Sequence, residues 1–120
     1  MGYNFIYFNK EKNRKTADVR IAVKQRGEYT AARIWFSSAN IEDITKTGFV
    51  RFAVPEGNKN QLFFFATDKD KGYKLHKQGN SSYMEIQQTN ITELMKRFEG
   101  KYDLEITEEN YIYVDRRNAL

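Results

Sequence analysis

The chain has 120 residues, the size of one ordinary domain, with 40% hydrophobic residues, 15% aromatic residues and no cysteine. The lack of cysteine excludes disulfides, thiolate metal sites and cysteine catalysis, and it is consistent with a cytoplasmic location. No apolar run approaches the roughly 20 residues of a membrane span, and the N-terminus has no signal-peptide pattern. We therefore expect no membrane partner.

The charged residues are unevenly distributed. Twenty Lys and Arg against sixteen Asp and Glu give a net charge of +4. Residues 1–32 hold seven basic and three acidic side chains, whereas residues 100–120 hold three basic and five acidic ones. A basic N-terminal part would suit a polyphosphate partner, although such a charge is also typical of a domain that is simply soluble.

Hydrophobic periodicity predicts a chain that is mostly β. Aromatic residues cluster at 3–8, and Val19, Ile21 and Val23 alternate with polar or small neighbours, as in a half-buried strand. In chain order, further strands are predicted at 33–36, 49–54, 62–65, 73–77, 83–86, 102–106 and 111–114. Apolar residues at helical spacing predict a helix over 90–99, and a shorter helical turn is expected at 40–44.

The same order of elements occurs twice, about fifty residues apart. Strand, basic turn, strand, short helix, glycine and two strands align so that Ile34 matches Met84, Gly48 matches Gly100 and Phe63 matches Tyr113. We expect one domain with an N-terminal strand and basic loop (1–18), a first half (19–66), a linker (67–72) and a second half (73–115). Two ββαββ-like halves too small to fold alone would form a small pseudo-two-fold β-barrel with short helices.

This layout resembles the AbrB, SpoVT and MazE-type DNA-binding domains, which are swapped-hairpin barrels usually built from two identical chains. The segment GYKLHKQGNSSYMEI is also similar to a pattern in small phage proteins. The resemblance implies DNA contacts from basic residues on the strands and turns, with Lys24, Arg26 and Lys77 as the nearest positional matches.

Basic residues on the first strands of each half form the candidate binding surface. A β-ribbon can enter the major groove, where lysine and arginine neutralise phosphates. Outward lysine and arginine side chains also occur simply for solubility, and aromatic residues more often belong to the core. The candidates for phosphate contact are Arg20, Lys24, Arg26, Arg33, Lys74 and Lys77. Trp35 and Phe63 are candidates for base stacking, and Lys10, Lys12, Arg14 and Lys15 could form a basic arm or a solvated loop.

Catalytic motifs are absent from the sequence. His76 is the single histidine, no nucleophile elbow or phosphate loop occurs, and the acidic turn at 68–72 lacks the remaining ligands of a calcium loop. We therefore expect no enzyme activity and no cofactor. The predicted function is non-catalytic DNA binding, as a regulator or a phage accessory protein. A phage-type inhibitor or interaction module, and a binder of small anionic nucleotides, are the alternatives, and a homo-oligomer remains open.

Overall fold

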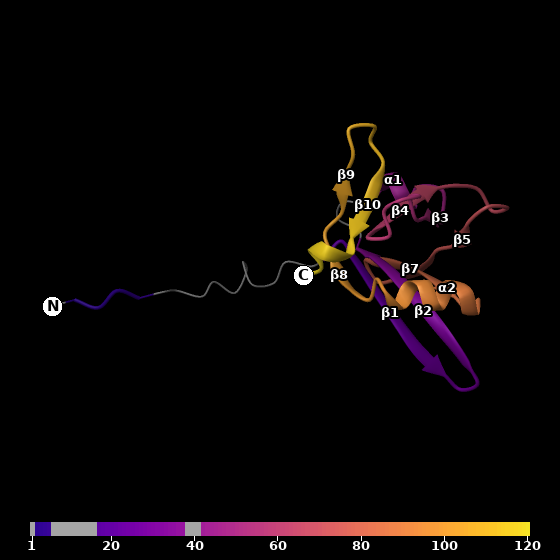
Figure 1. Ribbon diagram of the computed structural model, residues 1–120, viewed down its shortest axis with the longest axis horizontal. Helices are drawn as coiled ribbons and strands as arrows, with labels where there is room; N and C mark the ends of the chain where they lie inside the picture. Colours follow the sequence, from indigo (N-terminus) through magenta and orange to yellow (C-terminus); the bar gives the residue numbers. More distant parts are fainter. Residues whose placement is uncertain (1, 6–16, 38–41) are drawn as a thin grey trace.

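Two five-stranded antiparallel sheets make up the computed structural model, which describes residues 2–5, 17–37 and 42–120 (Figure 1). The first sheet has the order β6-β7-β2-β1-β8, formed by His76–Gln78, Ser81–Ile86, Tyr29–Ser37, Val19–Arg26 and Gly100–Tyr102. The second sheet has the order β5-β3-β4-β10-β9, formed by Tyr73–Lys74, Phe49–Ala53, Gln61–Ala66, Ile112–Asp115 and Glu105–Ile106. The helices are α1 (Glu42–Thr45), α2 (Thr89–Lys96) and the short 3₁₀ helix η2 (Arg116–Asn118).

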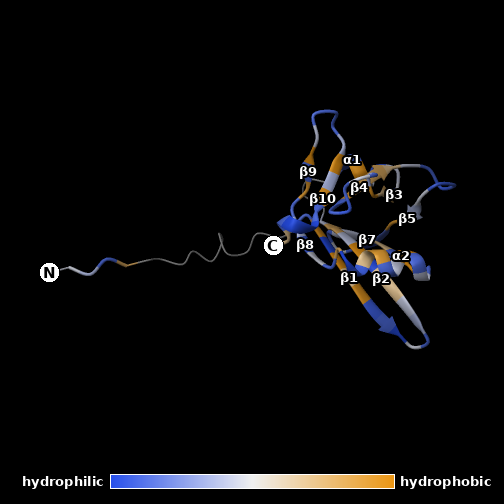
Figure 2. Cartoon of the chain, viewed as in Figure 1, coloured by the Kyte–Doolittle hydropathy of each residue, from blue (hydrophilic) through white to orange (hydrophobic). Residues whose placement is uncertain are grey.

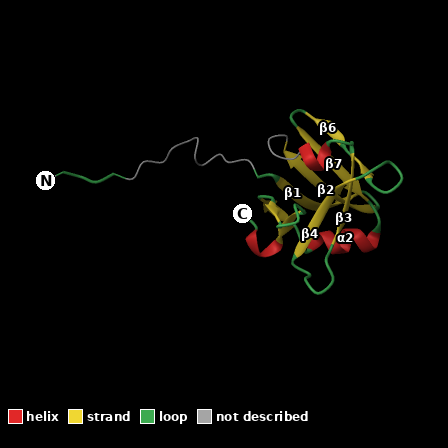
Figure 3. Cartoon of the chain, turned by 90° about the horizontal axis from the view of Figure 1, so that it is seen from above, coloured by secondary structure: helices red, strands yellow, loops and turns green. Residues whose placement is uncertain are grey.

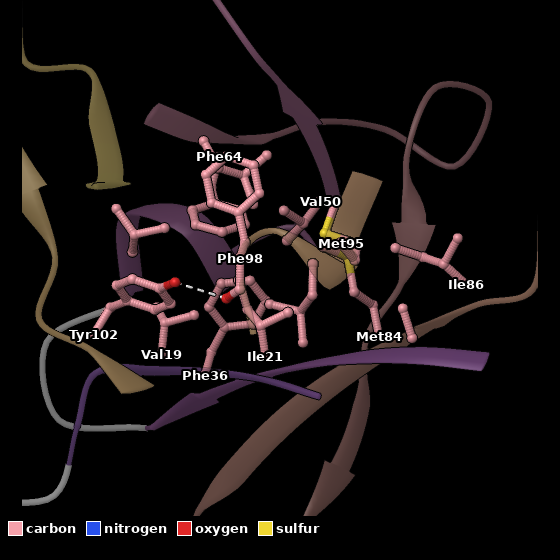
Figure 4. Packing of buried hydrophobic residues seen from close by; sticks show 14 of the residues in the cluster. Val19, Ile21, Phe36, Val50, Phe64, Met84, Ile86, Met95, Phe98 and Tyr102 are labelled. Carbon is pink, nitrogen blue, oxygen red and sulfur yellow. Dashed lines mark hydrogen bonds between the residues drawn. The ribbon is translucent and has the colours of Figure 1, made fainter. Parts of the chain in front are cut away.

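The two sheets lie face to face and share one hydrophobic core (Figures 3 and 4). Because side chains alternate along a strand, the inward positions of each sheet are apolar, and the Phe36 and Phe64 rings meet edge to face at 5.2 Å between centroids. Helix α2 adds Met95 and the turn after it adds Phe98, both 0% exposed, and the Tyr102 hydroxyl donates to the Phe98 carbonyl at 2.7 Å. Both halves of the sequence therefore contribute to a single core.

Equivalent residues of the two halves meet at the centre of each sheet. In the first sheet β2 pairs with β7, and Ile34 lies directly opposite Met84. In the second sheet β4 pairs with β10, and Phe63 lies directly opposite Tyr113. These are pairs that the alignment of the two halves matches.

The predicted barrel closure is wrong, although the mostly β architecture with short helices is confirmed. The chain passes between the sheets three times, from β2 to β3 and at two tight corners, from β5 to β6 and from β8 to β9, and each sheet remains open. At the second corner the Leu104 N–H donates to the Asp18 carboxylate at 3.0 Å instead of to a neighbouring strand. At this corner a polar side-chain contact thus takes the place of a strand partner, whereas at the first corner the Leu75 N–H donates to the Gly48 carbonyl at 2.8 Å.

Most strands occur where the sequence predicts them, with differences at the corners. The predicted strands at 73–77 and 102–106 are each divided into two short strands that belong to different sheets. The second helix begins one residue earlier than predicted and ends at Lys96. No strand occurs at residues 2–5, and the remainder of the predicted N-terminal strand and basic loop at 6–16 lies outside the described residues, as do residues 38–41.

Candidate nucleic-acid interface

Five basic side chains project from the outer face of the first sheet. Along β1 the odd-numbered residues Val19 and Ile21 enter the core, so the even-numbered residues point outward. Strand pairing places Arg33 opposite Ala22, and Lys101 opposite Arg20. We call this surface the cationic face: Arg20, Lys24, Arg26, Arg33 and Lys101. The C-terminal end of β1 is correspondingly hydrophilic (Figure 2).

A groove of about 430 Å³ runs between these side chains. Its short residues are Ala22, Ala31 and Gly100, whereas the five basic residues and Trp35 have long side chains that rise around them. The depression follows from this difference in side-chain length. Its lining can donate hydrogen bonds to several phosphate oxygens at once.

One carboxylate counterbalances the cationic face. Glu85 is the single acidic residue at the outward strand positions of the first sheet as described, opposite Arg33 in the β2–β7 pair. The Arg33 Nε donates to Glu85 at 2.9 Å, and the Arg26 Nε lies 3.9 Å from the same oxygen. The hydrogen bond from Arg33 holds the pKa of the Glu85 carboxyl below its usual value, against the opposing effect of burial. Glu85 is therefore ionised near neutral pH and partly neutralises the two guanidinium groups.

Aromatic rings continue the cationic face across the sheet. Lys101, Arg20, Trp35, Tyr83 and His76 occupy one row that crosses all five strands in register. The Arg20 guanidinium lies 5.1 Å from the Trp35 ring centroid. The distance between ring centroids is 4.5 Å for Trp35 and Tyr83, and 5.3 Å for Tyr83 and His76. Such a row, with cations at one end and flat rings at the other, suits a ligand that carries both phosphate and aromatic groups.

The structure brings most, but not all, of the predicted site residues together. Arg20, Lys24, Arg26, Arg33 and Trp35 share the outer face of the first sheet. The others lie elsewhere. Lys74 is on β5 in the second sheet, and Phe63 is at the centre of that sheet.

Lys77 points away from the cationic face. It pairs with Ser82, which lies opposite the buried Phe36, and it lines a separate depression with Glu42. Alternation along the strand therefore places Lys77 on the opposite side of the sheet from the outward row that contains His76.

The two basic turns, between β1 and β2 and between β6 and β7, do not share one surface. Strand β2 pairs with β1 on one side and β7 on the other, with Tyr29 opposite Arg26 at one end and Ser37 opposite Ser81 at the other. The β1–β2 turn and the β6–β7 turn therefore lie at opposite ends of the first sheet. The strand faces, not the pair of turns, bring the cations together.

Sequence reasoning missed Lys101, Tyr83 and Glu85. Lys101 lies in an acidic stretch of sequence, and only its pairing with Arg20 brings it to the face. A signal did exist for Tyr83, because antiparallel pairing about the matched Ile34 and Met84 places it opposite Trp35. The same register places Glu85 opposite Arg33.

Metal chemistry has no support in the described ranges. No group of three or more His, Asp or Glu there could hold a metal ion. The Asp68 carboxylate instead accepts a hydrogen bond from the Asp70 N–H at 3.1 Å, as expected of a linker turn. None of the helices described is long and apolar enough to cross a membrane.

Comparison with models of protein families, with curated proteins and with solved structures finds no match. We therefore infer function from the geometry and charge of the cationic face.

Proposed function

We propose that this protein binds nucleic acid without catalysis, through the cationic face. The observation that carries the proposal is the concentration of five basic side chains around one groove, with Glu85 as their single acidic neighbour at the outward strand positions described. Phosphate contacts dominate the affinity of proteins for nucleic acid, and they require such a convergence of lysine and arginine. The sandwich fold by itself supports no particular function.

The β1–β2 hairpin supports DNA as the nucleic acid. Strand β8 pairs only with residues 19–21 of β1, and β7 pairs only with residues 32–37 of β2, so the distal part of the hairpin is a two-stranded ribbon. It carries Lys24 and Arg26 and extends beyond the rest of the sheet (Figure 1). A two-stranded ribbon fits the major groove, while Arg20 and Lys101 at the base would contact the phosphate backbone.

We further propose that the two halves arose by duplication of a ββαββ unit, as the resemblance to swapped-hairpin DNA-binding domains implies. The meeting of matched residues Ile34 with Met84, and of Phe63 with Tyr113, supports this origin. A role as a regulator or a phage accessory protein would follow from the same resemblance.

A salt titration of DNA binding tests the function. We expect fluorescence anisotropy with labelled duplex and single-stranded DNA to show affinity that decreases steeply with salt. The Arg20→Ala/Lys24→Ala/Lys101→Ala variant should lose most of this binding. The matched control Lys46→Ala/Lys59→Ala/Lys77→Ala removes the same charge at exposed positions away from the face and should retain it. Equal losses in both folded variants would refute the assignment of the face.

Binding of a small anionic nucleotide is the second candidate, because a groove of about 430 Å³ lies within the size range of small-ligand sites. A nucleotide that prefers the folded state would raise the melting temperature in a thermal-shift assay. Saturable stabilisation by mononucleotides, with no salt-dependent binding of DNA, would favour this candidate over the first.

A further inference from the structure

The outer face of the second sheet carries four aromatic rings in a block. Phe63 and Phe65 project from β4. Tyr113 projects from β10, and Tyr111 immediately precedes that strand. The Phe63 and Tyr113 rings stack at 4.9 Å between centroids, and Phe65 meets Tyr111 at 5.9 Å. We call these four residues the aromatic face. They point away from the core, since Leu62, Phe64 and Val114 occupy the inward positions.

The aromatic face is unusually apolar for the outside of an antiparallel sheet. Such a sheet normally has polar side chains on its solvated side. Here Tyr111 is 52% exposed and the other three rings are partly exposed. Contiguous apolar surface of this kind marks an interaction site.

Opposite charges flank the aromatic face. Arg51 on β3 lies opposite Phe65 on one side, and Glu105 on β9 lies opposite Tyr113 on the other. Around Glu105, the segment 103–117 contains five carboxylates and two arginines, and Arg117 pairs with Asp115 at 2.6 Å, so this edge keeps a net negative charge. Arg51 and Lys71 both line a hollow beside Phe65, and Lys74 is exposed on the adjacent edge strand β5. The face is therefore basic at one edge, aromatic at its centre and acidic at the other edge.

We propose that a second copy of this chain docks on the aromatic face, in a two-fold symmetric dimer. A two-fold axis in the interface plane reverses the order of strands in the second copy. The axis is inclined to β4 and β10, which compensates for the two-residue offset between the Arg51–Phe65 and Tyr113–Glu105 pairs. The basic edge of each copy then faces the acidic edge of the other, and the aromatic blocks meet at the centre. Arg51 would face the partner copy's Glu105 twice, as an isologous interface requires. Nucleic acid fits this face less well, because the acidic edge would repel phosphates.

Charge reversal tests the dimer. Dimerisation is measured without nucleic acid, so the outcome is independent of the proposed function. We expect wild-type protein to sediment as a dimer in analytical ultracentrifugation. Arg51→Glu and Glu105→Arg should each weaken dimerisation by about tenfold or more, because each reversal changes two symmetric contacts. An equimolar mixture of the two variants should regain a dimer, since both contacts of the mixed pair would again join one acidic and one basic side chain.

Two controls separate this interface from non-specific effects. Lys24→Glu on the cationic face and Glu93→Arg on α2 change charge equally at positions outside the aromatic face and should leave dimerisation unchanged. Phe65→Ser/Tyr111→Ser, checked for folding by circular dichroism, should be monomeric. A monomeric wild type at every concentration, or single reversals that do not recover on mixing, would overturn the proposal.

Discussion

Replacing Glu85 by glutamine should strengthen nucleic-acid binding, a direction that damage to the fold would not produce. Glu85 accepts from Arg33 at 2.9 Å and lies 3.9 Å from Arg26, so it engages two of the five cations of the cationic face. If only the three others contact phosphates, the logarithmic salt slope is about −2.7, and release of both arginines would steepen it to about −4.5. Between 50 and 200 mM salt, affinity would then fall by about 40-fold in wild type and about 500-fold in the variant.

Fluorescence anisotropy over a salt series measures both quantities, and Glu56→Gln serves as the control. Glu56 is an exposed carboxylate in the turn between β3 and β4, so its replacement changes net charge equally but leaves Arg33 paired. We expect tighter binding at low salt and a steeper slope only for Glu85→Gln. Weaker binding, or an unchanged slope in a folded Glu85→Gln variant, would show that the two arginines do not contact phosphates.

The same substitution has a defined effect on stability. The pKa of Glu85 is lowered in the folded protein, so its contribution to stability is present above its unfolded pKa and is lost as the pH falls through the folded value. Near neutral pH, Glu85→Gln should cost about 1 kcal/mol, because the Arg33 hydrogen bond loses its charged acceptor. In urea denaturation this difference from wild type should shrink toward low pH, and a difference that persists unchanged there would contradict an electrostatic origin.

Three further predictions address the rings, the core and the C-terminal turn. Trp35→Ala should weaken binding of single-stranded DNA by about 1–3 kcal/mol if a base stacks on the ring, and quenching of Trp35 fluorescence in wild type provides an independent measurement. Ile34→Ala should lower the free energy of unfolding by about 2–5 kcal/mol in urea titrations, because Ile34 is 0% exposed at the centre of the shared core. Asp115→Ala should cost about 1 kcal/mol at neutral pH by removing the side-chain acceptor of the Arg117 N–H. The pKa of Asp115 is lowered mainly by its hydrogen bond from the Arg117 side chain, so this loss should diminish in calorimetry as the pH falls through the folded value.

Strand patterns and the alignment of the two halves both bear on the centre of each sheet. Alternation of apolar residues located β1 and β2, because one buried face imposes a period of two on each strand, and short apolar runs located β4 and β10. Matching the halves also identified Ile34 with Met84 and Phe63 with Tyr113, which the strand register places in direct contact. For β1 and β2 the local pattern was sufficient, because the apolar residues of each strand alternate with polar or small ones and so indicate which side is buried.

The composition of the cationic face could be predicted only in part. Arg20, Lys24 and Arg26 share a face because they are two or four residues apart on one strand, and the pairing of β1 with β2 through a short turn adds Arg33. Lys101 joins them through a pairing across about eighty residues, which no local pattern specifies. Lys77 does not join the cationic face, because its one-residue offset from His76 places it on the other side of the sheet.

The sequence by itself determined the mostly β character, the two short helices and the outward direction of the basic residues on β1. A strand buried on one face has apolar and polar residues in alternation, which can be read from the local sequence. The tertiary structure decided that two open sheets form instead of a closed barrel, and that the basic turns lie at opposite ends of the first sheet. It also gathered the four rings of the aromatic face between Arg51 and Glu105. Such long-range neighbours depend on strand order and register, which arise from packing the whole core at once.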